Sequence, residues 1–359
     1  MNAGVGSTGV SGTPPKVVVV IINWNGLQDT LECLESVGRL HYANVETLVI
    51  DNGSDPVEAR RIEQSTVVRR VVRSPVNLGS TGGANLGFRD ALQMGAEYVW
   101  FLNNDVVVDP DSLTKLVALG EQHSRIGLLS PVIYHYDEQQ SVQLTGTKVD
   151  FEHEAQKILR SLDEADIGPD GEGFALAGTA LLIKRRVLER VGGFDERLFA
   201  YVEDTDYSVS AMAAGFDTAL VRDARVYHKY GRSLGGRESP VREYLYTRNM
   251  YLFWTKHLKG RWRRRTYPVR YVAWVLERAV YARRRGQPES TEYILAGGWD
   301  ALRGKWGSWE TRGRLPRWIE KGLTRWILDW HPYFWTLLLR GDCRGFARGV
   351  ATRLRKARD

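Results

Sequence analysis

Three runs of apolar, mostly branched or aromatic residues each end in a polar segment. KVVVVII (16–22) leads into NWNG, VETLVI (45–50) into DNGSD, and AEYVWFL (96–102) into NNDVVVD. Apolar runs of this kind are typical of strands that are buried on both faces of a parallel sheet. The pattern therefore predicts strands whose polar ends share one edge of an open sheet, the edge at which such sheets bind ligands.

Helical patterns lie between and after these runs. Leu27, Leu31 and Leu34 have helical spacing, and the glycine-opened segment 82–95 follows the second run. Alternating strand and helix predicts an open α/β sheet that is mostly parallel and flanked by helices. The segment 174–196 reads as a strand, a short basic helix and a glycine turn, and 203–215 as a short helix closed by Gly215, followed by an extended segment.

The composition divides the chain into three parts. Residues 1–15 are small and polar without the features of a signal peptide, so we expect a flexible tail. An α/β domain is expected over 16–257, and a helical extension rich in Trp and Arg over 258–359. No apolar run approaches the roughly 20 residues that span a bilayer, so we do not expect an integral membrane protein.

The extension contains an amphipathic pattern. Its apolar positions recur at helical spacing; they are Leu315, Trp318, Ile319, Leu323, Trp326, Ile327 and Trp330. Most of the basic residues of this segment lie off that stripe. Two interpretations remain open: the helix packs on the core, or it contacts an anionic membrane surface.

The chain carries a formal net charge of +7 over 359 residues, which favours an anionic partner such as a phosphorylated substrate, a membrane surface or nucleic acid. No nucleic-acid recognition motif is present, so nucleic acid is not expected. Cys33 and Cys343 are far apart and have no metal-site spacing, which favours a reducing compartment, by default the cytoplasm.

Several polar strand endings offer ligand chemistry. Asp51 could accept hydrogen bonds from a nucleobase or simply belong to a turn, and Trp24 could stack on a base or pack on a helix. The Gly-rich segment 77–88 could approach a diphosphate, although its spacing fits neither the dinucleotide motif nor a P-loop. Asp105 offers a carboxylate to Mg²⁺ or Mn²⁺, and His228 offers a nitrogen that Mn²⁺ accepts.

Three carboxylates lie among aromatic residues in FAYVEDTDYS (199–208). Acidic residues at a helix start are explained by capping and by the helix dipole. A second explanation is catalysis, because the surrounding aromatic rings would lower the local dielectric and raise the pKa of a base toward a useful value.

Taken together, these motifs resemble the family 2 glycosyltransferases, which are inverting enzymes of the GT-A fold, and within them a bacterial rhamnosyltransferase-like branch. The resemblance covers about 16–258. It rests on NWNG, IDNGSD, NLGSTGGANLG, FLNND, the long block 177–208, YHKYG and TRNMYLFWTKH. The block from AGTALLI through GGFDE to EDTDYS is the most specific part.

The resemblance implies a role for each matching position. It implies Asp204 as the catalytic base, Asp105 and His228 as metal ligands, and Gly178, Thr179 and Glu203 near the sugar or acceptor. Asp206 either binds the acceptor or is structural, as an acidic residue at a helix start. For the donor it implies Asn23, Trp24, Asn25, Asp51, Asn77, Gly79, Gly82, Asn85, Asn104 and Arg248, with Asn249 beside Arg248. The family's Asp-x-Asp is Asn103-Asn104-Asp105 here, so only one carboxylate is offered to the metal.

The implied reaction is the transfer of a sugar, with L-rhamnose from dTDP-L-rhamnose expected, to a hydroxyl of a glycan or a lipid-linked glycan in polysaccharide synthesis. We expect a cytoplasmic protein that is peripheral at the inner face of the plasma membrane. The alternatives are a transferase using a UDP- or GDP-sugar and a non-catalytic nucleotide-sugar or polysaccharide-binding protein. A sugar-phosphate nucleotidyltransferase is disfavoured, because NWNGLQDT stands where its basic Gly-rich motif would follow the first strand.

Overall fold

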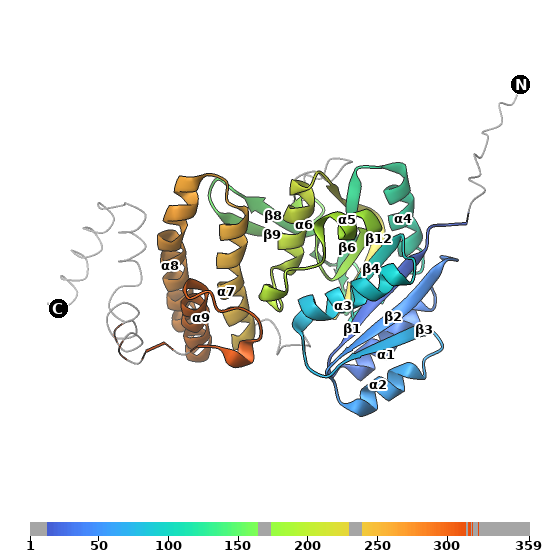
Figure 1. Ribbon diagram of the computed structural model, residues 1–359, viewed down its shortest axis with the longest axis horizontal. Helices are drawn as coiled ribbons and strands as arrows, with labels where there is room; N and C mark the ends of the chain where they lie inside the picture. The colour runs from blue at the N-terminus through green and yellow to red at the C-terminus, as the bar shows by residue number, and fades with distance from the viewer. Residues whose placement is uncertain are drawn as a thin grey trace, which may run out of the picture.

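The computed structural model describes residues 13–163, 174–229 and 239–313, together with 315, 316, 318 and 322. Within them the chain forms a large mixed sheet, a small second sheet and a layer of C-terminal helices (Figure 1). The large sheet has the strand order β3-β2-β1-β4-β11-β6-β12-β5, with β7 paired to β6. Its strands are β1 (Val17–Asn23), β2 (Val45–Asn52), β3 (Val68–Ser74), β4 (Tyr98–Asn103), β5 (Val106–Val108), β6 (Ile126–His135), β7 (Val142–Leu144), β11 (Ala180–Lys184) and β12 (Asp217–His228).

The three apolar runs form β1, β2 and β4, which pair in parallel at the centre of the N-terminal half of the sheet. Asn23 lies beside Asp51 across one pair, and Ile22 lies beside Asn103 across the other. The polar ends of the runs therefore meet at one sheet edge, as predicted. The β11 strand is antiparallel to β4 and β6, which makes the sheet mixed.

Helices cover both faces of this sheet, so the side chains of β1 are buried on both sides. Val17, Val19 and Ile21 pack with α1 (Leu27–Val37), α2 (Pro56–Glu63) and α4 (Ser112–Gln122). Val18 and Val20 face the other way and pack with α3 (Gly79–Gln93), α5 (Arg185–Val191) and α6 (Glu203–Ala213). The predicted helices around 27–34, 82–95, 185–191 and 203–213 are confirmed.

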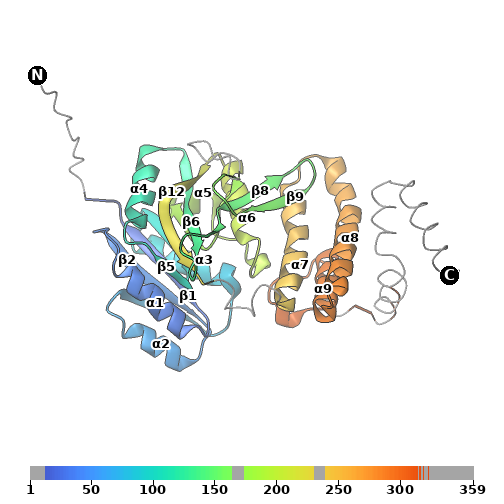
Figure 2. The same cartoon turned by 180° about the vertical axis from the view of Figure 1, so that it is seen from behind.

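The small sheet has the order β10-β8-β9, made by Phe174–Ala175, Gly146–Asp150 and Ala155–Leu159. In two opposite views it lies between the large sheet and the C-terminal helices (Figures 1 and 2). Short 3-10 turns at Glu196–Leu198 and Trp309–Thr311 complete the described elements.

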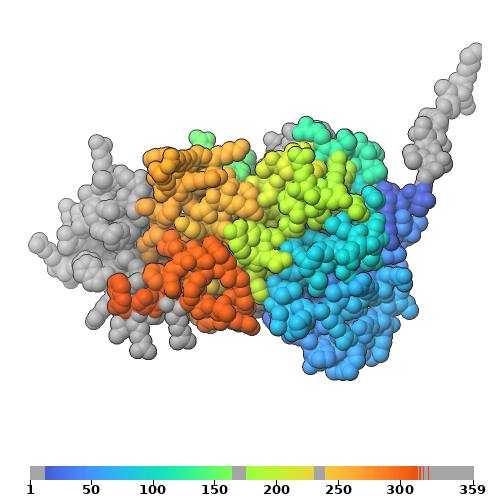
Figure 3. All heavy atoms as spheres, in the orientation of Figure 1, coloured from blue at the N-terminus to red at the C-terminus, as the bar shows by residue number. Residues whose placement is uncertain are grey.

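The C-terminal helices are α7 (Pro240–His257), α8 (Arg261–Arg284) and α9 (Pro288–Leu302). They share an apolar core with one another and with Val202 and Val209 at α6. The space-filling view shows this layer, orange to red, directly against the yellow-green part of the α/β unit (Figure 3). The compositional change near Leu258 falls in the turn between α7 and α8. Because α7 shares an apolar core with α8 and α9, it belongs to the same layer although it precedes that change.

Several expected features fall at the limits of the described residues. Most of the amphipathic segment 315–330 and residues 1–12 lie outside them, whereas the carbonyls of Pro14 and Pro15 accept hydrogen bonds from Asn44 and Tyr42. Trp318 is exposed. In the described part of the chain, each helix is too short or too polar to cross a bilayer.

Candidate active site

A cavity of about 350 Å³ opens at the sheet edge where β1, β2 and β4 end. Its walls come from these strand ends, the first turn of α3, the segment 199–204, the end of β12 and the start of α7. The lining residues that carry polar side chains are Trp24, Asn52, Asn77, Ser80, Asn103, Asn104, Asp105, Thr179, Tyr201, Glu203, Asp204, His228 and Arg242. This cavity joins the residues expected to bind the metal with the residue expected to act as base.

Asp105 and His228 form a buried pair in this cavity. The Nε2 of His228 lies 3.2 Å from Oδ1 of Asp105, and both side chains are at least nine-tenths buried. The two residues are brought together because β5 and β12 pair antiparallel, with His228 beside Val106. The backbone N–H of Lys229 donates to the carbonyl of Asp105, which fixes this register at the cavity.

Gln143, on β7, fixes the ring of His228. Its Oε1 lies 2.6 Å from Nδ1 of His228, and its amide nitrogen donates to the carbonyl of the same histidine at 3.2 Å. Because the amide oxygen only accepts, Nδ1 carries the proton of this contact and Nε2 turns toward Asp105. Nothing in the sequence marks Gln143, since it lies in a short strand far from the family motifs.

The pair fits a divalent cation. Oδ1 of Asp105 is buried and accepts no hydrogen bond in the described structure. Two cis ligands of an octahedral Mn²⁺ or Mg²⁺ lie about 3 Å apart, given metal–ligand distances near 2.1 Å. Among the described residues no group of three His, Cys, Asp or Glu side chains surrounds a metal position, so further ligands would have to be amides, water or substrate oxygens.

Glu203 and Asp204 begin α6 on the opposite wall. Oδ2 of Asp204 accepts from the N–H of Gly178 at 3.0 Å, and Oδ1 accepts from the N–H of Thr205 at 2.7 Å. Oε1 of Glu203 accepts from Oγ of Ser80 at 2.6 Å. These contacts hold both carboxylates at the cavity. Among the described residues, neither carboxylate forms a salt bridge with a Lys, Arg or His side chain.

Both acidic groups have raised pKa values. Burial, followed by the negative charge of Asp204, raises the pKa of Glu203 to about 7. Burial also raises the pKa of Asp204, against the lowering effect of the N–H groups of Gly178 and Thr205. A buried carboxyl group with a pKa of about 7, beside a second carboxyl group whose pKa is also raised, is suited to general acid–base chemistry.

The segment before these acids has an unusual backbone. Phe199, Tyr201 and Val202 have φ angles of 64°, 68° and 74°, in the left-handed region that non-glycine residues rarely adopt. Such outliers persist only where neighbouring contacts hold them, and they concentrate at functional sites. Gly79 makes room for this segment, because a Cβ there would lie 2.2 Å from the carbonyl oxygen of Phe199.

Seven of the residues expected at the donor are found in or beside the cavity. Trp24, Asn77, Gly79 and Asn104 line it. Asn23, Asn25 and Asp51 stand at the strand edge but are absent from the lining. Asn23 bonds to Thr30, Ser54 and Glu58, the side chain of Asn25 bonds to the N–H of Asp55, and Asp51 accepts from the N–H of Ser54.

Five expected site residues lie away from the cavity, and one of them is Asn249, whose amide donates to main-chain carbonyls of the segment 198–201. Gly82 faces Leu78 inside the first turns of α3, and the side chain of Asn85 bonds to the main chain of Phe194. Asp206 is buried on the far side of α6, where it pairs with Lys256 and His257. Arg248 is buried and donates to main-chain carbonyls, because its position on α7 faces the segment 197–198 and not the cavity.

The expected acceptor residues Gly178 and Thr179 do line the cavity. Several further lining residues were not among the expected site residues, and three of them carry side chains that bear on the chemistry. Ser80 follows the glycine that opens α3, Tyr201 precedes the acid pair, and Arg242 begins α7. Ser80 and Tyr201 lie inside the family motifs and could have been found there, whereas Arg242 lies outside them.

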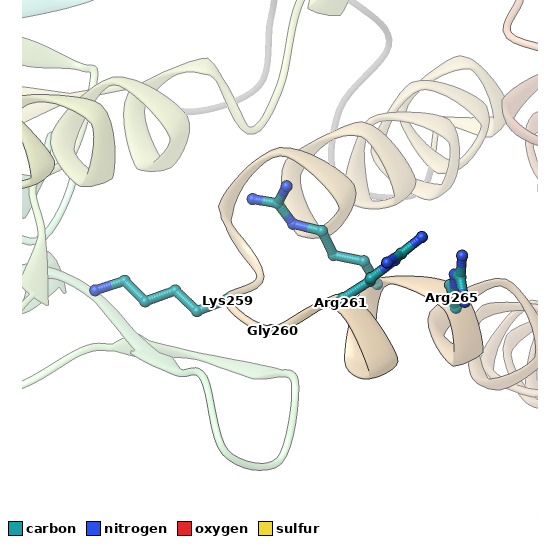
Figure 4. Close-up of a pocket in the computed structure, with 5 residues that line it drawn as sticks. Lys259, Gly260, Arg261 and Arg265 are labelled. Carbon is teal, nitrogen blue, oxygen red and sulfur yellow. The ribbon is translucent and has the colours of Figure 1, made fainter.

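A second hollow lies at the turn between α7 and α8. It is lined by Lys259, Gly260, Arg261, Arg264 and Arg265, and Figure 4 shows Lys259 on one side of the turn and Arg261 and Arg265 on the other. The described residues provide no salt-bridge partner for these four cations, and Trp262 beside them is 73% exposed. Without an acid or a strand end, this hollow has the chemistry of an anion-binding surface and not of a catalytic site.

A family model matches this chain across every residue that lines the cavity. The model of the family described as "Glycosyltransferase like family 2" matches residues 14–247. An N-acetylglucosaminyl-diphospho-decaprenol L-rhamnosyltransferase of Mycobacterium tuberculosis is 25% identical over 246 residues, covering 61% of this chain and 77% of that protein. The galactofuranosyltransferase GlfT1 of Mycolicibacterium smegmatis is 25% identical over 196 residues, covering 53% and 65%.

Two other comparisons differ in coverage. An uncharacterised protein, y4gI, of Sinorhizobium fredii is 27% identical over 279 residues, which are 71% of this chain but only 28% of that protein. A solved mannosyltransferase of Pyrobaculum calidifontis, in complex with GDP-Man and Mn²⁺, superposes with a TM-score of 0.52 at 17% identity, covering 81% of this chain and 88% of that one. The structural likeness shows the fold, and the family match shows that this chain belongs to the family 2 glycosyltransferases and is a nucleotide-sugar glycosyltransferase.

Proposed function

We propose that this glycosyltransferase inverts the anomeric centre of its donor in a single displacement, with Asp204 as the base. The observation that carries the proposal is the placement of Asp204 and the Asp105–His228 pair on two walls of one cavity. Asp204 removes the proton from an acceptor hydroxyl, the freed oxygen attacks the anomeric carbon, and the bond to the nucleoside diphosphate breaks. Attack opposite the leaving group inverts the configuration.

The environment of Asp204 supports this role. Its raised pKa makes it a stronger base than an exposed aspartate, and two N–H donors fix its orientation. The negative charge of Asp204 in turn raises the pKa of Glu203, so the two carboxyl groups are electrostatically linked.

We propose that Asp105 and His228 hold Mg²⁺ or Mn²⁺, with Gln143 orienting the histidine. When bound, the cation neutralises charge on the departing diphosphate. The buried oxygen Oδ1 of Asp105, which accepts no hydrogen bond, and the mixed oxygen and nitrogen donor set support this assignment. The solved mannosyltransferase with the same fold was obtained with Mn²⁺.

For the donor we propose dTDP-L-rhamnose, with UDP- or GDP-sugars as the alternative. The support is the rhamnosyltransferase of M. tuberculosis and a dTDP-rhamnosyl transferase of Shigella flexneri, 22% identical over 249 residues, among the relatives. Trp24 is available to stack on the base, and Asn77 and Asn104 face the same space. Asp51, Asn23 and Asn25 would shape the strand edge that receives the base.

We propose a glycan or lipid-linked glycan as the acceptor, and an anionic membrane surface as the place where the protein meets it. The basic hollow at 259–265 and the exposed Trp262 support the membrane contact, since clustered cations and an interfacial Trp favour anionic lipid. The cytoplasmic face of the plasma membrane would provide such a surface.

A donor screen tests the proposal. Purified full-length protein is incubated with Mn²⁺, a lipid-linked glycan acceptor mixture and dTDP-L-rhamnose, UDP-sugars or GDP-sugars, and release of the nucleoside diphosphate is measured. Transfer from dTDP-L-rhamnose with inverted configuration by NMR supports it. Transfer from another donor only would overturn the donor assignment, and a retained configuration would overturn the mechanism.

A further inference from the structure

The left-handed segment 199–202 ends directly at the acid pair and also forms part of the cavity wall. None of its residues is glycine, so the conformation is not an intrinsic preference of the sequence. Contacts from outside the segment must hold it. The described structure supplies them from two sides.

Asn249 of α7 supplies the first side. It is fully buried, and its amide nitrogen donates to the carbonyls of Leu198, Ala200 and Tyr201 at 2.8, 2.8 and 2.9 Å. An amide has two N–H groups, so three carbonyls share them. One side chain thus holds the main chain at Leu198, just before the segment, and at Ala200 and Tyr201 within it.

Arg248 fixes the orientation of that amide. Its guanidinium donates to Oδ1 of Asn249 at 3.0 and 3.1 Å, so the amide nitrogen is left to face the segment. The same guanidinium donates to the carbonyls of Leu198 and Gly307. A charged donor of this kind makes stronger hydrogen bonds than a neutral one.

The first turn of α3 supplies the second side. The carbonyl of Phe199 accepts from the N–H and hydroxyl of Thr81 and from the hydroxyl of Ser80. The segment is therefore held between α3, whose start lines the cavity, and α7. Both sets of contacts act on main-chain groups of the segment, while the side chains of Phe199 and Val202 pack into apolar clusters.

We propose that Asn249, oriented by Arg248, is a positioning residue that holds the strained segment 199–202 and so places the carboxylate of Asp204 against Gly178. The inference rests on the proposed role of Asp204 as base. It assigns Arg248 and Asn249 to the geometry of the base and not to contact with the donor.

The test compares Asn249→Ala, Asn249→Asp and Asn249→Ser in the full-length protein. Alanine and aspartate remove the amide donors, whereas serine keeps one hydroxyl donor. Thr247→Val is the matched control, because Thr247 is equally buried on the same helix and its hydroxyl has no hydrogen-bond partner in the described structure. Ile294→Ala, in the core of the C-terminal helices, serves as a destabilised control that keeps the side chain of Asn249 and its hydrogen-bond donors.

We expect Asn249→Ala and Asn249→Asp to lower kcat by about 10- to 100-fold, with serine intermediate, while the affinity for dTDP and the donor KM change by less than about twofold. Both controls should keep wild-type kcat below their melting temperatures. Wild-type kcat in folded Asn249→Ala would overturn the proposal, and so would an equal loss in Ile294→Ala. If the alanine variant does not fold, the serine and aspartate variants decide in the same way.

Hydrogen–deuterium exchange separates this inference from the proposed function. Asn249→Ala should speed exchange in peptides covering 199–206 at least tenfold and leave β1 and β4 unchanged. Unchanged exchange at 199–206 would overturn the inference even if the enzyme uses dTDP-L-rhamnose. Faster exchange there, with no activity from any donor in the wild type, would overturn the proposed function alone.

Discussion

The hydroxyl of Ser80 donates to Oε1 of Glu203 at 2.6 Å and joins the first turn of α3 to the first turn of α6. This contact lowers the pKa of Glu203, whereas burial and the charge of Asp204 raise it, and the raising effects dominate to give a value of about 7. The wall that begins with the Gly-rich segment is thus bonded directly to the acid pair. The protonation of the pair is therefore sensitive to both walls of the cavity.

Glu203→Gln should change how stability depends on pH. The pKa of Glu203 rises from an ordinary value of 4.5 to about 7 on folding, so the folded protein binds more protons than the unfolded chain between these values. Stability of the wild type must then fall as pH rises through this window. Glutamine removes this decline. The difference in melting temperature, variant minus wild type, should therefore be more positive at pH 8 than at pH 5.

Differential scanning fluorimetry at both pH values measures this effect. Glu292→Gln, at an exposed position of α9, is the control and should shift the melting temperature equally at pH 5 and pH 8. A shift for Glu203→Gln that does not depend on pH would contradict the raised pKa.

Asp204→Asn should fold and bind donor, yet lose turnover by roughly 10²–10⁴-fold, because an amide cannot remove the proton from the hydroxyl of the acceptor sugar. The amide oxygen can still accept from the N–H of Gly178 or Thr205, so the local structure should persist. Steady-state rates at saturating donor and acceptor measure the loss. Turnover near wild type would remove Asp204 from the proposed mechanism.

Asp105→Ala and His228→Ala should both weaken metal-dependent binding of dTDP, with the larger loss for Asp105 because hard cations prefer oxygen ligands. Gln143→Leu should weaken Mn²⁺ binding by about 10- to 100-fold, since it removes the acceptor that orients His228. Calorimetry with and without Mn²⁺ measures both effects.

Gln156→Leu in β9 is the control for the glutamine substitution, because the amide nitrogen of Gln156 has no hydrogen-bond partner in the described structure. The metal assignment fails if dTDP affinity in the presence of Mn²⁺ is the same in the wild type and both ligand variants.

Arg261→Glu combined with Arg265→Glu should reduce binding to anionic vesicles at least tenfold in low salt, because each cation near such a surface contributes about 1 kcal/mol. Wild-type protein should float with vesicles containing phosphatidylglycerol and remain behind with neutral vesicles. The control is Arg60→Glu combined with Arg61→Glu, at two exposed positions of α2 at the other end of the molecule. It reverses the same number of positive charges away from the hollow. Failure of the wild type to float, or equal flotation of both double variants, would refute the membrane contact.

The sheet could be predicted because burial on two faces leaves a strong signal in β1, β2 and β4. Their apolar runs have few interpretations other than central strands, and their polar ends mark the cavity edge. Asp105 and His228 are separated by more than a hundred residues, and no local pattern predicts that β5 and β12 pair. The resemblance to a family suggested the two residues, and the register of the strands explains why they meet.

Other parts of the site leave no local signal. The segment 199–202 contains no glycine, so its left-handed backbone is imposed by Asn249 and α3 and not encoded locally. Arg248 has the charge expected of a phosphate contact, yet main-chain carbonyls surround it. Gln143 acts by fixing the tautomer of His228, and only the tertiary structure brings these two side chains together.

The helix α7 has Arg242 of the cavity in its first turn and the basic hollow just past its end. Seventeen residues separate Arg242 from Lys259, and an α-helix rises 1.5 Å per residue, so the two sites stand on the order of 25 Å apart. If a bilayer contacts the hollow while α7 stands along the bilayer normal, its headgroups are separated from the Arg242 end of the cavity by about that length. A lipid-linked acceptor would then have to extend over this length for its reacting hydroxyl to reach Asp204.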